Sequence, residues 1–224
     1  MITTASAPPT RTPRTLSRDE RRTQLIEATI ATISECGLSR TTLTEVARRA
    51  GLSHGLVLFH FDTKEKLLVE TLDYLSDEYR NNWQMALKDC GPAPEQRLAA
   101  LIDADFSPVV SNPGRVNAWA SFWGESQSRP LYLSKCGEND AVYIRTLDGV
   151  CADMNTAYGY TVEPARAARM IRIMIEGLWL EMMTLLDPYS KEEAKQTAWT
   201  CASLLYPRHF GPDGLLRPEA GTPQ

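Results

Sequence analysis

The chain has 224 residues, of which 43% are hydrophobic, which is enough for one large domain or for a small domain and a larger one. Its net charge of −4 excludes a uniformly basic protein that coats nucleic acid. Residues 1–66 carry ten Lys and Arg against seven Asp and Glu, a net of +3, so the remainder carries −7. This asymmetry favours DNA contact at one end and a different task at the other.

Several classes of protein are disfavoured by the pattern of the chain. It has no apolar run of about 18 residues or more, so we expect no membrane span. The first residues are rich in Ala, Pro, Thr and Arg without an apolar segment, which predicts a disordered arm over 1–16 instead of a secretory signal. The five cysteines are scattered without a C-x-x-C motif. This predicts free thiols, a cytoplasmic location, and neither a metal nor a cofactor.

Helical periodicity runs through almost the whole chain, and no segment shows sustained strand alternation. We therefore predict an all-α fold of about nine helices. Ser17 and Glu20 have the spacing of a capping box that starts the first helix, and Gly37 is expected to end it as a left-handed cap. The next helix begins at Thr41 or Thr42 and ends before Gly51. The remaining predicted helices lie at about 53–59, 63–88, 95–106, 114–126, 130–158, 164–186 and 191–206.

These elements divide the chain into four parts. A disordered arm over 1–16 precedes a helix-turn-helix domain over 17–62. A larger helical domain follows over 63–207, and residues 208–224 are expected to form a loose tail.

Two short helices on either side of Ala50-Gly51-Leu52 predict a helix-turn-helix. In that motif the first helix crosses the DNA backbone and the second enters the major groove. Gly51 supplies the positive φ that the sharp turn needs. The alternative is an ordinary helical hairpin, because two helices joined through a glycine are common.

Three segments carry a family resemblance: TTL at 41–43, VARRAGLSHG at 46–55 and FHFDTKEKLL at 59–68. They resemble the DNA-binding domain of the TetR family of bacterial regulators, over about 50 contiguous residues from Arg22. The resemblance implies a double-stranded DNA operator as partner. It also implies that the larger domain binds a small-molecule effector and forms a homodimer.

The same resemblance implies roles for individual side chains. Thr42 and Lys64 match phosphate-contacting positions of the family, while Gly55 permits close backbone approach and Leu56 is suited to a thymine methyl. The predicted DNA-binding residues are Arg22, Thr42, Thr44, Arg48, Ser53, His54, Gly55, Leu56, Leu58, Phe59, His60 and Lys64.

The chain departs from the family at Leu58-Phe59-His60-Phe61, where Tyr-His-Tyr-Phe is common. The aromatic hydroxyls that usually contact phosphate are therefore missing. His60 is a candidate to donate to a phosphate instead, most strongly when protonated, and its alternative role is packing.

Aromatic side chains recur at helical spacing in the larger domain. Trp119, Phe122 and Trp123 share one helix face. Such spacing usually marks a core, but five tryptophans between Trp83 and Trp199 make an aromatic-lined pocket a second reading.

Three further segments, AWASFW at 118–123, RPLY at 129–132 and EGLWL at 176–180, resemble the Bet repressor subgroup, which controls genes for the conversion of choline to glycine betaine. The resemblance implies a quaternary ammonium held by aromatic faces and a carboxylate, although other small amines or acids stay open. The predicted ligand-binding residues are Tyr79, Trp83, Trp119, Phe122, Trp123, Glu125, Tyr143, Glu176 and Trp179.

The family forms its dimer through the last two helices, and the chain has apolar stripes there. They comprise Met170, Ile173, Met174, Gly177, Leu178, Ala198, Ala202, Leu205 and Tyr206.

The expected function is a repressor that leaves a palindromic operator when its effector binds, with the fourth helix as the lever between Lys64 and Tyr79. One alternative is a redox sensor that uses Cys136 or Cys151. An enzyme is the other, disfavoured because G-x-S-x-G, H-E-x-x-H, P-loop and GxGxxG motifs are all missing, and because Asp103 and Asp105 suggest a solvated face.

Overall fold

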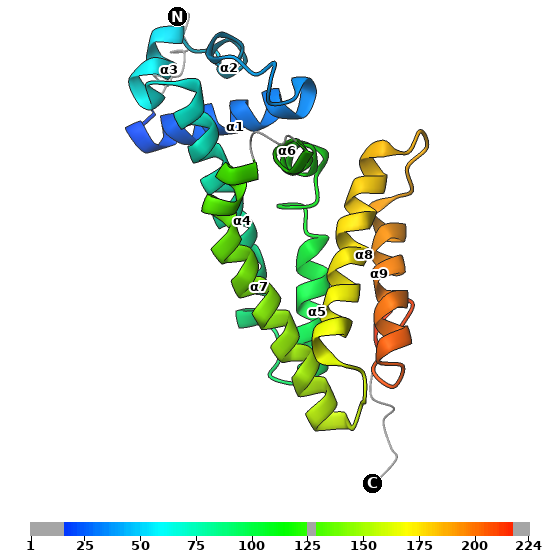
Figure 1. The fold of residues 1–224 in the computed structure, drawn as a ribbon. Helices are drawn as coiled ribbons and strands as arrows, with labels where there is room; N and C mark the ends of the chain where they lie inside the picture. Colours follow the sequence, from blue (N-terminus) through cyan, green and yellow to red (C-terminus); the bar gives the residue numbers. More distant parts are fainter. Residues whose placement is uncertain (1–15, 125–128, 217–224) are drawn as a thin grey trace, which may run out of the picture.

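The computed structural model describes residues 16–124 and 129–216, and this part of the chain is all-α apart from one short hairpin (Figure 1). The all-α prediction is confirmed. The described elements are α1 (Arg18–Cys36), α2 (Leu43–Ala50), α3 (His54–Phe61), α4 (Lys64–Asp89), α5 (Pro94–Asp105), α6 (Pro113–Gly124), α7 (Arg129–Tyr158), α8 (Pro164–Thr184), α9 (Lys191–Leu205), β1 (Phe210–Gly211) and β2 (Gly214–Leu215).

Side-chain caps fix where the first helices begin. Ser17 and Glu20 form the predicted capping box at α1. Thr63 caps α4 through the backbone N–H of Lys66. Gly37 ends α1 with φ 77° but ψ 167°, so the left-handed cap predicted there is wrong, although the positive φ still suits glycine.

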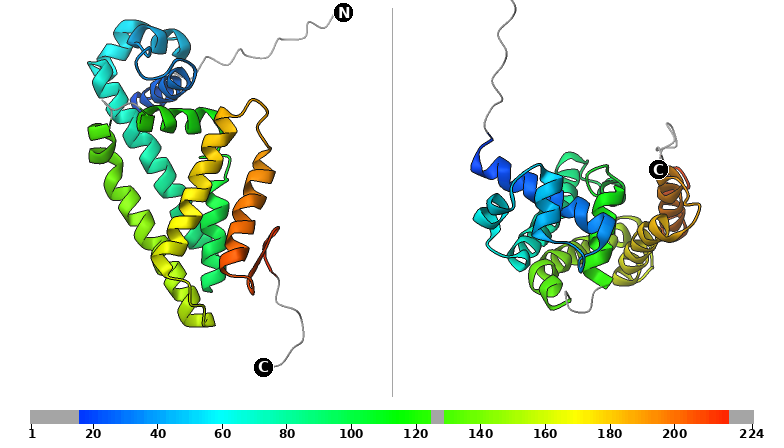
Figure 2. Two further views of the ribbon diagram at one scale, coloured as in Figure 1. Left: turned by 45° about the vertical axis from the view of Figure 1, so that its right-hand side comes forward. Right: turned by 90° about the horizontal axis from the view of Figure 1, so that it is seen from above.

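The helices α1, α2 and α3 form a head at one end of the molecule, and α4 runs out of this head alongside α7 (Figure 1). The helix α6 lies beneath the head against α1, and α8 and α9 pack side by side along the larger domain (Figure 2). The core of the head continues into α6, where Ala118 and Phe122 are fully buried. The head therefore rests directly on the larger domain.

The expected loose tail over 208–224 is wrong for its first part. Residues 210–215 form an antiparallel hairpin in which Phe210 pairs with Leu215. Phe210 is 1% exposed and stacks on Trp199 of α9, with ring centroids 5.8 Å apart. Residues 217–224 lie outside the described part of the chain. Burial of one aromatic ring thus extends the core of the larger domain to the hairpin.

Within the described residues, no helix combines the length and the apolar character that crossing a membrane requires. All five cysteines lie in this part of the chain and are free thiols.

Candidate functional site

The turn between α2 and α3 is held by a small buried core. Val46 and Val57 have no exposed surface, and Phe61 closes the same core from the end of α3. Gly51 adopts the left-handed conformation, with φ 67° and ψ 33°, and ends α2. Ser53 caps α3 by accepting a hydrogen bond of 3.2 Å from the backbone N–H of Leu56. The two helices therefore cross at a fixed angle, as the predicted helix-turn-helix requires.

The outer face of α3 is exposed and largely apolar. Phe59 is 66% exposed and Leu58 is 37% exposed, while Leu56 is half-buried. His54 is exposed at the N-terminus of α3, where its Nδ1 lies 3.4 Å from Oγ1 of Thr44 on α2. The remaining predicted residues that are exposed in the head are Thr42, Arg48, Ser53 and Gly55.

His60 does not lie on this face. It is 6% exposed, and burial together with the positive charges of Arg18 and Arg22 lowers its pKa. A buried imidazole that resists protonation is a poor phosphate donor. The packing role therefore holds, and the phosphate contact proposed for His60 is wrong in this conformation.

Two of the predicted basic residues brace the head internally. Arg22 forms an ion pair with Glu70, donates to the carbonyl of His60 at 2.9 Å and lies over the Phe61 ring. The Lys64 ammonium donates to the carbonyls of Leu38 at 3.0 Å and of Ser39 at 3.3 Å. An ammonium has three donors, so that of Lys64 keeps one for a further acceptor.

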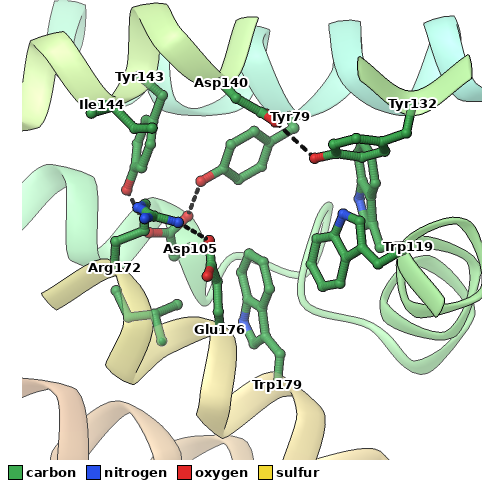
Figure 3. Close-up of a pocket in the computed structure, with 12 residues that line it drawn as sticks. Tyr79, Asp105, Trp119, Tyr132, Asp140, Tyr143, Ile144, Arg172, Glu176 and Trp179 are labelled. Carbon is green, nitrogen blue, oxygen red and sulfur yellow. Dashed lines mark hydrogen bonds and ion pairs between the residues drawn. The ribbon is translucent and has the colours of Figure 1, made fainter. Parts of the chain in front are cut away.

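A cavity of about 330 Å³ opens in the larger domain between α4, α5, α6, α7 and α8 (Figure 3). Aromatic rings and carboxylates dominate its wall. The residues that line it are Tyr79, Asp105, Trp119, Trp123, Tyr132, Asp140, Tyr143, Ile144, Arg172, Ile175, Glu176 and Trp179.

Asp105 forms one end of the cavity. It is 2% exposed, and each of its carboxylate oxygens accepts a hydrogen bond of 2.8 Å, one from the Tyr79 hydroxyl and one from the Tyr143 hydroxyl. Burial raises the pKa of Asp105 to about 7, the two hydroxyls oppose this, and nearby Glu176 adds to it. The solvated surface role expected for Asp105 is therefore wrong, whereas Asp103 does lie at the surface beside Lys195.

Three aromatic rings form the other end of the cavity. Trp119 and Trp123 stack with centroids 6.1 Å apart, and Tyr132 stands edge-on to both. The Tyr132 hydroxyl donates to Asp140 at 2.8 Å, which places a second carboxylate beside the rings. This arrangement matches an aromatic cage for an organic cation.

Between these ends, α8 contributes an ion pair and an indole. Glu176 accepts a hydrogen bond of 2.7 Å from Arg172, one turn earlier on α8. Trp179 stands edge-on to Tyr79 with centroids 6.3 Å apart, and its buried Nε1 has no hydrogen-bond partner within the described structure.

Only some of the residues predicted to bind a ligand line this cavity. Trp83 is buried behind Tyr143, and Phe122 belongs to the core shared with the head, so neither lines the cavity. Glu125 lies outside the described residues. The lining residues that the prediction named are Tyr79, Trp119, Trp123, Tyr143, Glu176 and Trp179, and those it missed are Asp105, Tyr132, Asp140, Ile144, Arg172 and Ile175.

A head that presents a recognition helix, joined to a larger helical domain with a cavity, is the architecture of a helix-turn-helix regulator. Residues 25–71 match the bacterial regulatory proteins of the tetR family, and residues 94–205 match the C-terminal domain of BetI-type transcriptional repressors. The chain belongs to the TetR family of transcriptional regulators, and its larger domain is of the BetI type. Members of this family are regulators and not enzymes.

Individual relatives agree with this assignment. The HTH-type transcriptional regulator BetI of Paraburkholderia xenovorans is 32% identical over 189 residues, which cover 83% of this chain and 93% of the relative. BetI of Stenotrophomonas maltophilia is 30% identical, with 80% and 89% covered.

Solved structures share the fold. A transcriptional regulator from Pseudomonas aeruginosa superposes with a TM-score of 0.71 at 24% identity, covering 86% of this chain and 93% of that one. A regulator from Saccharomonospora viridis, solved in complex with choline, gives a TM-score of 0.70 at 17% identity, covering 80% and 94%.

Proposed function

We propose that this protein is a repressor that leaves a palindromic operator when a small organic cation, of which choline is the first candidate, binds in the cavity. The observation that carries the proposal is the charge of the lining: three carboxylates against one guanidinium, set among six aromatic rings. The choline-bound regulator from Saccharomonospora viridis supports the same class of ligand.

The arrangement of charged side chains in the cavity favours a ligand with at least one positive charge. Glu176 is paired with Arg172, whereas Asp105 and Asp140 form no ion pair within the part of the chain that the structure describes. Both carboxyl groups accept hydrogen bonds from tyrosine hydroxyls, which orient them without supplying a positive charge, and burial raises the pKa of both. A quaternary ammonium loses little hydration energy on entry and gains contact with the aromatic faces of Trp119 and Trp123.

We further propose a homodimer that uses the outer face of α8. Met170, Ile173 and Leu180 are 47%, 55% and 52% exposed there, and Leu204 of α9 is 79% exposed. An unpartnered apolar face of this kind is typical of an interface between subunits. Of the residues predicted for this interface, Met170, Ile173, Met174 and Gly177 are exposed, whereas Leu180 and Leu204 were not predicted. The rest of the predicted stripe must be corrected, because these residues are buried within the chain: Leu178, Ala198, Ala202, Leu205 and Tyr206.

Transmission between cavity and head has two routes in this proposal. The helix α4 carries Lys64 at the head and Tyr79 at the cavity, as the sequence suggested. The helix α6 carries Trp119 at the cavity, and its Asn117 donates to Ser34 of α1 at 3.1 Å. A ligand that binds more tightly to one position of α6 shifts the equilibrium between two orientations of the head. The size of this shift is set by the difference in the ligand's affinity for the two states.

The redox alternative receives no support from the thiols. Burial raises the pKa of Cys136 to about 12 and that of Cys151 to about 11. Because the thiolate is the reactive species, both side chains are poorly suited to sensing oxidants.

The proposal is tested with choline and with 3,3-dimethyl-1-butanol, which has the same shape without the charge. We expect choline to raise the melting temperature of the protein and, in a gel-shift assay, to release it from the DNA upstream of its own gene. The neutral alcohol should do neither. Trp119→Ala should abolish the response to choline. Equal responses to both compounds would show that the cavity does not recognise charge.

A further inference from the structure

The exposed face of α3 offers few ways to read a DNA base. His54, Gly55, Leu58 and Phe59 share this face by helical spacing, while Val57, His60 and Phe61 lie on the opposite, buried face. Leu58 and Phe59 are the large apolar side chains of this face and are 37% and 66% exposed.

Direct readout of bases usually depends on side chains with two hydrogen-bonding atoms. Arg or Lys binds guanine, and Asn or Gln binds adenine. The sequence of α3, HGLVLFHF, has none of these four types. Its one exposed hydrogen-bonding side chain is His54, and Thr44 already engages Nδ1 of that ring at 3.4 Å. This leaves Nε2 for a single base.

The absence of a side chain at Gly55 allows another molecule to approach the backbone of α3 closely. A Cβ added at this residue would meet no atom within 4 Å, and its φ lies outside the positive range. Glycine within a helix is less favourable than alanine. Neither the packing around Gly55 nor its backbone conformation requires a glycine at this position. A glycine here is consistent with a face of α3 that lies close against the major groove.

We propose that α3 recognises its operator mainly through the 5-methyl groups of thymines, which Leu58 and Phe59 contact, and through one hydrogen-bonded base opposite His54. The inference rests on the DNA binding that the family assignment establishes. Apolar side chains discriminate thymine by its methyl group, the one apolar feature of the major groove.

The test begins with the full-length protein and a random pool of duplex DNA, from which preferred sequences are selected. Each thymine of a selected duplex is then replaced by deoxyuridine, which removes only the methyl group. We expect at least two positions in each half-site at which this replacement weakens binding roughly fourfold, because burying one such group contributes about 0.8 kcal/mol.

Three variants assign the contacts. Leu58→Ala and Phe59→Ala should each weaken binding and remove the penalty of deoxyuridine at one thymine position. Gly55→Ala should raise the melting temperature and weaken binding, a combination that simple misfolding cannot give. Met85→Ala, at a side chain of α4 that is 62% exposed and remote from the head, is the matched control and should leave the DNA affinity unchanged.

Two results overturn the proposal. Operators that bind equally well with deoxyuridine at every position show that the methyl groups are not read, even if DNA binding itself is intact. Failure to select any duplex would contradict DNA binding by the head and so remove the basis of the inference.

Discussion

Arg115 of α6 donates two hydrogen bonds of 2.7 Å each to the carboxylate of Glu27 of α1. The same guanidinium donates to Glu78 of α4 at 2.9 and 3.0 Å, and its side chain is only 15% exposed. Tyr74 of α4 also donates to Glu27, at 2.9 Å. One side chain of α6 thus joins α1 of the head to α4, and both α4 and α6 contribute residues to the cavity wall.

We predict that Arg115→Gln separates ligand binding from DNA release. Two carboxylates lose their partner, so the free energy of unfolding should fall by about 2 kcal/mol. The affinity for choline should stay within a few-fold, because Arg115 does not line the cavity. Calorimetry and a gel-shift assay on the same sample measure the two effects.

The matched control is Arg145→Gln, which breaks an exposed pair with Glu138 and should change neither property. If choline still releases DNA from the Arg115 variant with full efficiency, the coupling does not pass through this contact.

We predict that the affinity for an organic cation rises with pH through the neutral range. The pKa of Asp105 is raised to about 7, so the carboxylate is mostly protonated below that pH and attracts a cation less. Binding should tighten up to tenfold per pH unit on the acid side and then level off. Asp105→Asn should weaken binding and flatten the profile, and a profile that is unchanged in this variant would assign the proton to another group.

The same carboxyl has an opposite effect on folding. Its pKa is higher in the folded chain than its ordinary value of 3.8, so the folded state binds more protons between about pH 4 and pH 7. The contribution of Asp105 to stability is therefore complete at acid pH and is lost as pH rises through about 7. Urea unfolding of the protein and of Asp105→Asn should show a difference in stability that shifts in favour of the variant toward higher pH.

We predict that replacing a tryptophan that lines the cavity affects ligand binding, whereas replacing one buried behind the lining affects stability. Trp123→Ala removes a ring that lines the cavity and is 42% exposed, so the affinity for choline should fall at least tenfold with little loss of stability. Trp83→Ala removes a buried ring outside the lining, so unfolding should become easier by about 3–5 kcal/mol. Isothermal calorimetry and thermal unfolding separate the two outcomes, and a binding loss confined to Trp83→Ala would reverse the assignment.

We predict that the C-terminal hairpin is part of the folded core. Phe210→Ala should lower the free energy of unfolding by about 3 kcal/mol, because the ring is buried against Trp199. Leu186→Ala, at a fully exposed leucine, is the control and should have little effect. Equal stability of the two variants in chemical denaturation would mean that the hairpin does not stay packed in solution.

The sequence alone determined the helices and the head. Capping residues such as Ser17 and Ser53 and the glycine at Gly51 act over three or four residues, so their effects are visible in local spacing. The aromatic residues that line the cavity were also visible in part, because Trp119 and Trp123 share a helix face at adjacent turns. Even the burial of Asp105 had a local signal, since it continues the buried spacing of Leu98, Leu101 and Ile102 along α5.

Only the tertiary structure decided which side chains meet. Tyr79, Asp105 and Tyr143 come from three helices, and no local pattern specifies that two hydroxyls converge on one carboxylate. The burial of His60 and the hairpin at Phe210 depend in the same way on partners distant in the chain. A short-range pattern fixes which face of a helix is apolar, whereas the identity of its neighbour, and with it the charge and shape of the cavity, is set by how the helices pack.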